Sequence, residues 1–213
     1  MRDNITHLQL EYTDVENHNN LGSVPHLKIE DFAQKITHKI TMRDLVLPAN
    51  EKKLLYNIIY HTKDELKVYE DQGFTEKSDR GLGLTVLFLG DSRTAKMRAA
   101  EALANELNLD LFKVDLSAIV RKYIGEIEKV LQRLFDECEE DGAILFFDEA
   151  DSLLGKRTEV SDSYDRYSNT QIDYILKRIE AYRGLAILST IMKKSIDSAF
   201  TRRVRFVVNF SNP

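Results

Sequence analysis

Apolar residues recur along this chain in two alternating patterns, and the first consists of short runs that are almost entirely apolar. These runs have the length of buried strands, and they lie at residues 84–89, 111–115, 143–147, 185–190 and 206–210. Strands that are apolar on both faces are typical of a parallel sheet covered on both sides. The pattern therefore predicts an α/β fold built on a parallel sheet of five strands.

The second pattern lies between these runs, where apolar residues recur every three or four positions, as on one face of a helix. The clearest case spans residues 125–139, with an apolar stripe of Ile127, Val130, Leu131, Leu134, Phe135 and Cys138. Similar spacing predicts helices over residues 51–69, around 100–107 and around 172–179. We expect these helices to cover both faces of the sheet, with Cys138 buried between them.

The first 40 residues differ from the rest, because they are polar and rich in Asn, His and Asp. They contain a loop signal at residues 19–22, and only a short helix is predicted, over residues 29–40. We therefore expect a helical or irregular appendage or linker over residues 1–40, and one main domain over residues 41–213.

Composition narrows the class of protein. The chain has 213 residues, of which 43% are hydrophobic and 31% charged, and its net charge of −5 argues against nucleic acid as the primary ligand. Cys138 is the single cysteine, which rules out an internal disulfide, and the five histidines lack metal-ligand spacing. The apolar runs are too short to span a bilayer, so we expect a cytoplasmic protein without a membrane span.

Candidate chemistry begins directly after the first apolar run. Residues 90–97 occupy the eight positions of the phosphate-loop pattern G-x-x-x-x-G-K-[ST], with Gly90 and Lys96 matched and with Ala95 and Met97 in place of the second Gly and the hydroxyl residue. Such a loop surrounds phosphates with backbone N–H groups at a helix N-terminus. On its own the partial match favours an ordinary strand-to-helix turn with an exposed lysine.

A second signal favours the chemical interpretation. The apolar run at residues 143–147 ends abruptly in two carboxylates, Asp148 and Glu149. Ligands of a parallel sheet gather at the carboxyl ends of its strands, where this pair is expected. If the phosphate loop lies beside it, Asp148 would hold Mg²⁺ and Glu149 would polarise an attacking water. The alternative is a solvated strand end.

Several further segments resemble the AAA family of ATPases, in the family's order. KYIGEIEK (residues 122–129) is similar to the first pore loop, FFDEADSLLGKR (146–157) to the Walker B strand and second loop, and SAFTRRVRF (198–206) to the arginine-finger segment. DLVLP (44–48), GLGLTVLF (81–88) and AYRGLAIL (181–188) resemble the AAA ATPases of extracellular contractile, phage-tail-like injection systems. The resemblance covers residues 41–213 and implies a P-loop NTPase fold.

The resemblance also implies roles for single residues. The nucleotide-binding set would be Gly90, Ser92, Thr94, Ala95, Lys96, Met97 and Asp148, with ATP and Mg²⁺ as cofactors and Asp148 as the metal ligand. Glu149 would act on water, while Arg202 and Arg205 would reach a neighbouring subunit's site in a homo-oligomeric ring. The pore loop would comprise Lys122, Tyr123, Ile124 and Gly125, with Tyr123 gripping a protein substrate. Family members continue into a helical lid, which we expect to be missing after Pro213.

The departures from the family pattern concentrate on the nucleotide. Ala95 and Arg93 replace glycines, and the Cβ of Ala95 would either crowd the phosphates or cost on the order of 1 kcal/mol if a left-handed backbone is needed there. Met97 replaces a hydroxyl ligand of Mg²⁺ with a thioether, which is a poor ligand for so hard a cation. Ile191 replaces a polar residue that positions water, and losing one such contact costs about 10²–10³ in rate.

Three functions remain open at this stage. The first is an ATP-binding AAA domain that drives protein remodelling or unfolding in a ring, with hydrolysis impaired by Ala95, Met97 and Ile191. The second is a pseudo-ATPase, a scaffold or assembly protein with weak or no nucleotide binding. The third, an unrelated nucleotide kinase, is disfavoured by the pore-loop and arginine-finger segments.

Overall fold

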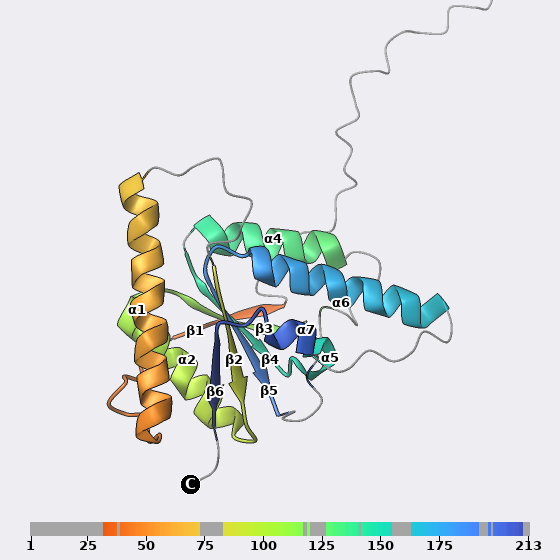
Figure 1. Ribbon diagram of the computed structural model, residues 1–213. Helices are drawn as coiled ribbons and strands as arrows, with labels where there is room; N and C mark the ends of the chain where they lie inside the picture. Colours follow the sequence, from red (N-terminus) through yellow and green to blue (C-terminus); the bar gives the residue numbers. More distant parts are fainter. Residues whose placement is uncertain are drawn as a thin grey trace, which may run out of the picture.

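The computed structural model (Figure 1) describes residues 32–37, 39–72, 83–116, 119, 127–140, 142–154, 163–191, 196 and 198–210. In chain order its elements are β1 (Ala33–Ile36), α1 (Ala49–Gln72), β2 (Leu84–Leu89), α2 (Arg93–Leu107), β3 (Leu111–Asp115), α4 (Ile127–Glu140), β4 (Ile144–Asp148), α5 (Asp151–Leu154), α6 (Ser163–Ala181), β5 (Leu185–Thr190), α7 (Ser198–Thr201) and β6 (Phe206–Asn209). Strands and helices alternate as the apolar pattern predicts.

A six-stranded sheet forms the centre of the molecule, in the order β1-β3-β4-β5-β2-β6. The five strands from β2 to β6 are mutually parallel, which confirms the predicted parallel sheet. The sixth, β1, pairs antiparallel with β3 at the edge. The helix predicted over residues 29–40 is wrong, because Ala33–Ile36 is a strand: its few apolar residues could not distinguish a short edge strand from a helical turn.

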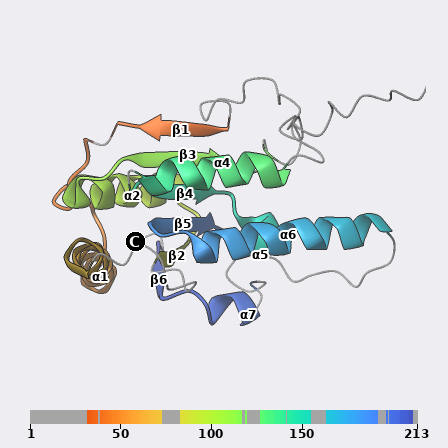
Figure 2. The same ribbon diagram turned by 90° about the horizontal axis from the view of Figure 1, so that it is seen from above.

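Each face of the sheet has its own apolar core, as expected from strand geometry. Successive residues of β5 alternate between the two: Leu185 and Ile187 pack with α1 and α2, and Ala186 and Leu188 pack with α4 and α6. Figure 2 shows helices on both sides of the strands. The predicted α/β fold with helices on both faces is confirmed.

Two smaller sequence predictions also have an outcome. Cys138 lies on the apolar stripe of α4 and is only 1% exposed, so it is a buried packing residue as expected. Across the part of the chain that the structure describes, no helix combines the length and the apolar character that crossing a membrane requires.

Candidate nucleotide site

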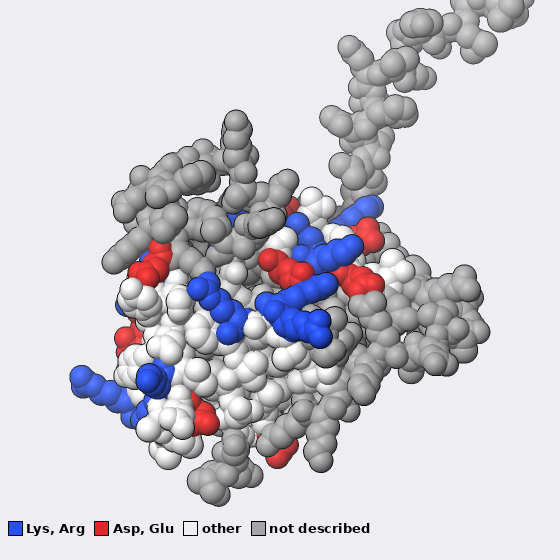
Figure 3. Space-filling view, in the orientation of Figure 1, with Lys and Arg blue, Asp and Glu red and all other residues white. Residues whose placement is uncertain are grey.

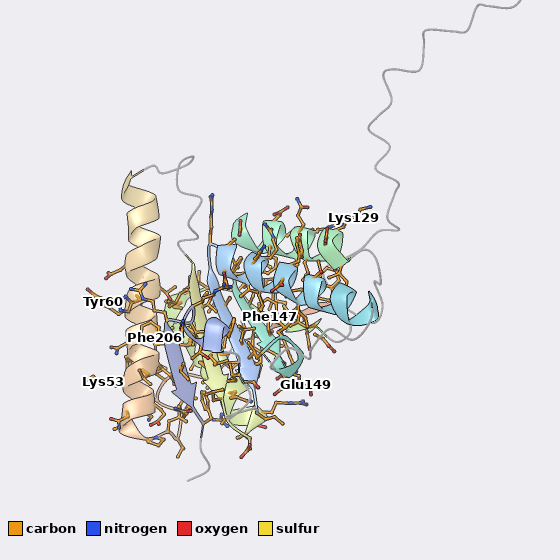
Figure 4. All side chains as sticks on the ribbon, turned by 45° about the vertical axis from the view of Figure 1, so that its right-hand side comes forward. Lys53, Tyr60, Lys129, Phe147, Glu149 and Phe206 are labelled. Carbon is orange, nitrogen blue, oxygen red and sulfur yellow. The ribbon has the colours of Figure 1, made fainter. Side chains whose placement is uncertain are left out.

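The parallel strands place their carboxyl ends along one edge of the sheet, the lower edge in Figure 1, and a cavity of about 520 Å³ lies there. Its lining comes from the carboxyl ends of β4 and β5 and from the segments that follow β2, β4 and β5: Asp91, Arg93, Lys96, Asp148, Glu149, Asp151, Ser189, Thr190 and Ile191. Figure 4 shows Glu149 at this edge and Phe147 inside the core. The fold thus brings the phosphate-loop residues and the acidic pair together.

Gly90 opens the turn between β2 and α2, and its backbone explains the residue type. Its φ of +143° is one that side chains rarely permit, and a Cβ there would lie 2.2 Å from the carbonyl oxygen of Phe210. Its N–H donates to the carbonyl of Thr190 at 3.1 Å, which ties the turn to the end of β5. Glycine is therefore required here by strand packing, whatever ligand the turn receives.

The loop itself is short, because α2 already begins at Arg93. Ser92 is the N-cap: its Oγ accepts from the N–H of Ala95 at 3.2 Å, and its carbonyl accepts from the N–H of Lys96 at 3.2 Å. Only Gly90, Asp91 and Ser92 lie between strand and helix, so positions 93–97 of the pattern are helical. The backbone N–H groups of Ala95 and Lys96 therefore already donate hydrogen bonds to Ser92.

The remaining pattern residues do not all face the cavity. Ala95 lies in the first turn of α2 and is absent from the described residues with positive φ, so the strain expected for a left-handed alanine does not arise. Met97 packs against the core between α1, α2 and the sheet, and it does not line the cavity. Thr94 is exposed and lines a second cavity of about 260 Å³, on the other side of the loop.

Lys96 is the most deeply buried charged residue near the site, with 2% of its surface exposed. Its Nζ donates to the carbonyl oxygens of Gly90 at 2.7 Å and Thr190 at 3.0 Å. Removal from water lowers the pKa of the Lys96 ammonium, and the nearby carboxylates of Asp148 and Asp151 oppose that shift. The lysine that the resemblance assigns to the phosphates therefore holds the ends of β2 and β5 together in this structure.

The acidic pair is held by basic side chains. Asp148 Oδ2 lies 3.1 Å from Lys113 Nζ and 3.8 Å from Arg93 Nε, and Arg93 also forms an ion pair with Glu149. The Asp148 side chain is 10% exposed, whereas those of Arg93 and Glu149 are 60% and 55% exposed. Glu149 has a φ of +53°, which a residue with a Cβ adopts at a cost. Both carboxylates thus have cations beside them from their own chain.

The end of β5 completes the site through Asp151, the first residue of α5. Its Oδ1 accepts from Thr190 Oγ1 at 2.5 Å and from the N–H of Ile191 at 3.3 Å. Ile191 is 58% exposed and lines the cavity with a side chain that cannot hydrogen-bond. The position where the family pattern expects a polar group to orient water therefore offers only hydrocarbon.

The sequence analysis missed two residues of this arrangement, Lys113 and Asp151. It also missed the role of Arg93 as the partner of the acidic pair. Lys113 is an isolated lysine inside the apolar run LFKVD, and β3 pairs with β4 so that Lys113 lies opposite Phe146, close to the acidic end. That isolated charge was the available signal. Arg93 was identified only as the loss of a glycine, because its partners lie more than fifty residues away in the sequence.

The residues present do not fit Mg²⁺, the metal that the family resemblance implies. Asp148 Oδ2 is already paired with Lys113 and Arg93, and Met97, at the position of the usual hydroxyl ligand, is partly buried against the core. Among the residues that the structure describes, no group of three or more His, Cys, Asp or Glu side chains could hold a metal ion. Magnesium prefers several oxygen ligands in a strict geometry, which this donor set does not supply.

The remaining predicted site residues lie elsewhere. Arg202 and Arg205 are exposed and do not line the cavity. The N–H of Arg205 donates to the carbonyl of Thr85 near the amino end of β2, and its Nη2 lies 3.3 Å from Nδ1 of His61. The predicted pore loop, Lys122, Tyr123, Ile124 and Gly125, lies outside the described residues.

Comparison with known proteins gives consistent relatives. An uncharacterized AAA family ATPase, y4kL of Sinorhizobium fredii, is 28% identical over 187 residues, which is 86% of this chain and 53% of that protein. The cell division cycle protein 48 homolog of Archaeoglobus fulgidus is 36% identical over 57% of this chain and 17% of its own length. The chain therefore spans about half of the first relative and a smaller part of the second.

Solved structures share the fold. The AAA domain of FIGL-1 matches with a TM-score of 0.64 at 21% identity, over 90% of this chain and 64% of that domain. The same domain in complex with ADP matches with a TM-score of 0.61. A family model described as "ATPase family associated with various cellular activities (AAA)" matches residues 86–212. Because that match covers more than half of the sequence, this chain belongs to the AAA family of ATPases.

Proposed function

We propose that this chain is an AAA domain that binds a nucleotide but does not hydrolyse it at a useful rate, and that acts through protein contacts in an assembly. The observation that carries the proposal is the pairing of Arg93 with both Glu149 and Asp148. A general base must have its carboxylate free to accept a proton from water, and the metal ligand must have an oxygen free for the metal. Here the chain's own cations occupy both.

The end of β5 supports the same conclusion. Ile191 stands at the cavity where a polar side chain would orient the attacking water, and a lost contact of that kind costs about 10²–10³ in rate. These effects do not multiply independently when groups act as a unit. Even one of them, added to a paired general base, is enough to make turnover too slow to drive mechanical work.

Nucleotide binding is supported by the space on either side of the loop. The cavity of about 520 Å³ carries Arg93 and the N-terminus of α2, both suited to phosphate. The second cavity, of about 260 Å³, is lined by Asp44, by the apolar residues Leu45, Val46 and Leu47, and by residues 92, 94, 95 and 98. We infer that phosphates occupy the first cavity and that the apolar leucines of the second receive the base.

A second candidate function, a scaffold that binds no nucleotide, is favoured by Lys96 and Ser92. The Lys96 ammonium donates to two backbone carbonyls, and Ser92 engages two backbone N–H groups that could otherwise meet a phosphate. If these contacts do not open when nucleotide is offered, the domain would function through protein contacts alone.

One experiment separates these possibilities. Binding of ATP and ADP is measured by calorimetry on the purified chain, and phosphate release is followed on the same sample. We expect measurable binding together with release at the background rate, unchanged in Glu149→Gln. Release that disappears in Glu149→Gln would contradict the proposal and establish a working ATPase. An absence of binding at millimolar nucleotide would favour the scaffold.

The exposed arginines suggest how the domain meets its partners. Arg202 is exposed and does not line the cavity of its own chain, while its neighbour Arg203 pairs with Glu180 of α6 at 2.8 Å. Figure 3 shows Lys and Arg side chains gathered beside acidic ones over the region of α6 and α7. We propose that this face contacts a second copy of the chain in a ring, within an assembly of the contractile, phage-tail-like kind. A loss of oligomer in Arg202→Glu, measured by light scattering, is the expected result.

A further inference from the structure

The acidic pair of this site is neutralised by two cations that bind to one carboxylate oxygen. Lys113 Nζ and Arg93 Nε approach the same atom, Asp148 Oδ2, at 3.1 and 3.8 Å. Arg93 reaches across to Glu149 as well, so its guanidinium lies between the two acids. The charges of Asp148, Glu149, Arg93 and Lys113 cancel as a group.

This position is the one that a divalent cation would take in an AAA site, between the acidic pair and the phosphates. A metal ion there would bring two further positive charges to a cluster that is already neutral, and it would have to displace the guanidinium from Glu149. Met97, partly buried against the α1 and α2 core, offers no oxygen to offset that loss. Mg²⁺ would therefore gain less from the acidic pair than it would if Arg93 and Lys113 were absent.

Arg93 has the geometry to do what the metal does. A guanidinium carries five N–H donors in a planar fork, more than the Asp148 and Glu149 contacts use, and it binds carboxylate and phosphate in the same bidentate manner. Arg93 rises from the first turn of α2, lines the cavity and keeps 60% of its side chain exposed, so a phosphate in the cavity can reach it.

We infer that Arg93 replaces the divalent metal ion, so that this site takes its nucleotide phosphates in metal-free form. This inference rests on the proposed nucleotide binding, and it names the ligand species that the site prefers. The Arg93 guanidinium bridges the acidic pair and the phosphates. Together with Lys113, which pairs with Asp148, it supplies the two positive charges that a divalent metal ion would bring. Added Mg²⁺ therefore brings no gain in affinity.

The test uses a fluorescent ATP analogue titrated into the purified full chain, once with EDTA and once with MgCl₂. The variants are Arg93→Gln, Arg93→Lys and a matched control, Arg133→Gln. Arg133 is also an exposed helical arginine paired with a glutamate, but it lies on α4, away from the cavity. Thermal melting of each variant verifies that it is folded.

The expected result is equal affinity of the wild type in both buffers. Arg93→Gln should weaken metal-free binding by about tenfold to a hundredfold, the range for a lost hydrogen bond to a charged group. Arg93→Lys should recover part of that loss, and Arg133→Gln should behave as wild type. In Arg93→Gln, Glu149 loses its cation while Asp148 keeps Lys113, so added MgCl₂ should restore part of the lost affinity.

Three results would overturn the inference, and the last of them is distinguishable from the first two. If the wild type binds only with MgCl₂, or if Arg93→Gln binds without metal as tightly as wild type, Arg93 is no substitute for the metal and the proposed nucleotide binding stands. If the wild type binds in neither buffer, the proposed nucleotide binding fails and the inference fails with it.

Discussion

Replacement of Lys96 by methionine tests whether this lysine stabilises the folded protein. Methionine has nearly the length of lysine but cannot donate, so the substitution leaves the carbonyls of Gly90 and Thr190 without the ammonium that binds them at 2.7 and 3.0 Å. Lys96 is 2% exposed, so water cannot easily take its place. A lysine reserved for phosphate would behave differently, because its removal would leave the free protein unaffected.

The magnitude follows from these two contacts. A hydrogen bond from a charged donor contributes about 1.5–3 kcal/mol to stability, so two of them contribute about 3–6 kcal/mol before other terms. Removing the ammonium also abolishes the unfavourable burial of its charge, which returns part of that amount. We therefore expect Lys96→Met to lower the free energy of unfolding by about 2–4 kcal/mol.

Urea unfolding followed by circular dichroism at neutral pH and without nucleotide measures this quantity. Lys53→Met is the control, because Lys53 is an exposed lysine of α1, and it should change stability by no more than about 0.5 kcal/mol. If Lys96→Met unfolds at the same urea concentration as Lys53→Met, the ammonium does not hold the strand ends together, and the structural role assigned to it is refuted.

Three further predictions use the same unfolding assay. Because burial lowers the pKa of Lys96 below its ordinary 10.5, the unfolded chain binds more protons than the folded chain between the two pKa values, and folded stability rises with pH there. The stability difference between wild type and Lys96→Met should therefore widen as pH rises toward 10.5; a constant difference would contradict the shift. Gly90→Ala should lower stability by about 2–3 kcal/mol, since its Cβ would lie 2.2 Å from Phe210 O, and an unchanged midpoint would refute that contact. Asn108 ends α2 with a φ of +54°, so Asn108→Ala should cost about 1 kcal/mol while Asn108→Gly costs nothing; equal effects of the two would show that the backbone there is not left-handed.

The departures at the nucleotide site were visible in the sequence, but their consequences were only partly predictable. Met97 and Ile191 depart from the family pattern, and the structure places Met97 against the core and Ile191 at the cavity. For Ala95 one of two expected costs does not arise, because α2 begins early enough to make that residue helical. The N-cap geometry of Ser92 decides where the helix begins, and a pattern match does not specify it.

The sequence by itself determined the layers of this protein. Runs such as residues 84–89 are apolar at every position except Thr85, which is typical of a sheet covered on both faces, and the stripe of α4 specifies which side of that helix is buried. These properties depend on neighbours a few residues apart, so periodicity alone reveals them. The edge strand β1 escaped the same reasoning, since four residues hold too few repeats to show a period.

Only the tertiary structure decided the chemistry of the site. Arg93, Lys113 and Asp148 belong to α2, β3 and β4, and they meet because parallel strands deliver their carboxyl ends to one edge of the sheet. Lys96 meets Thr190, ninety-four positions further along the chain, for the same reason. The interaction between such charges depends on how close they lie in space, which their spacing in the sequence does not encode. Because these charges pair, the phosphate-loop region is occupied by the chain's own side chains.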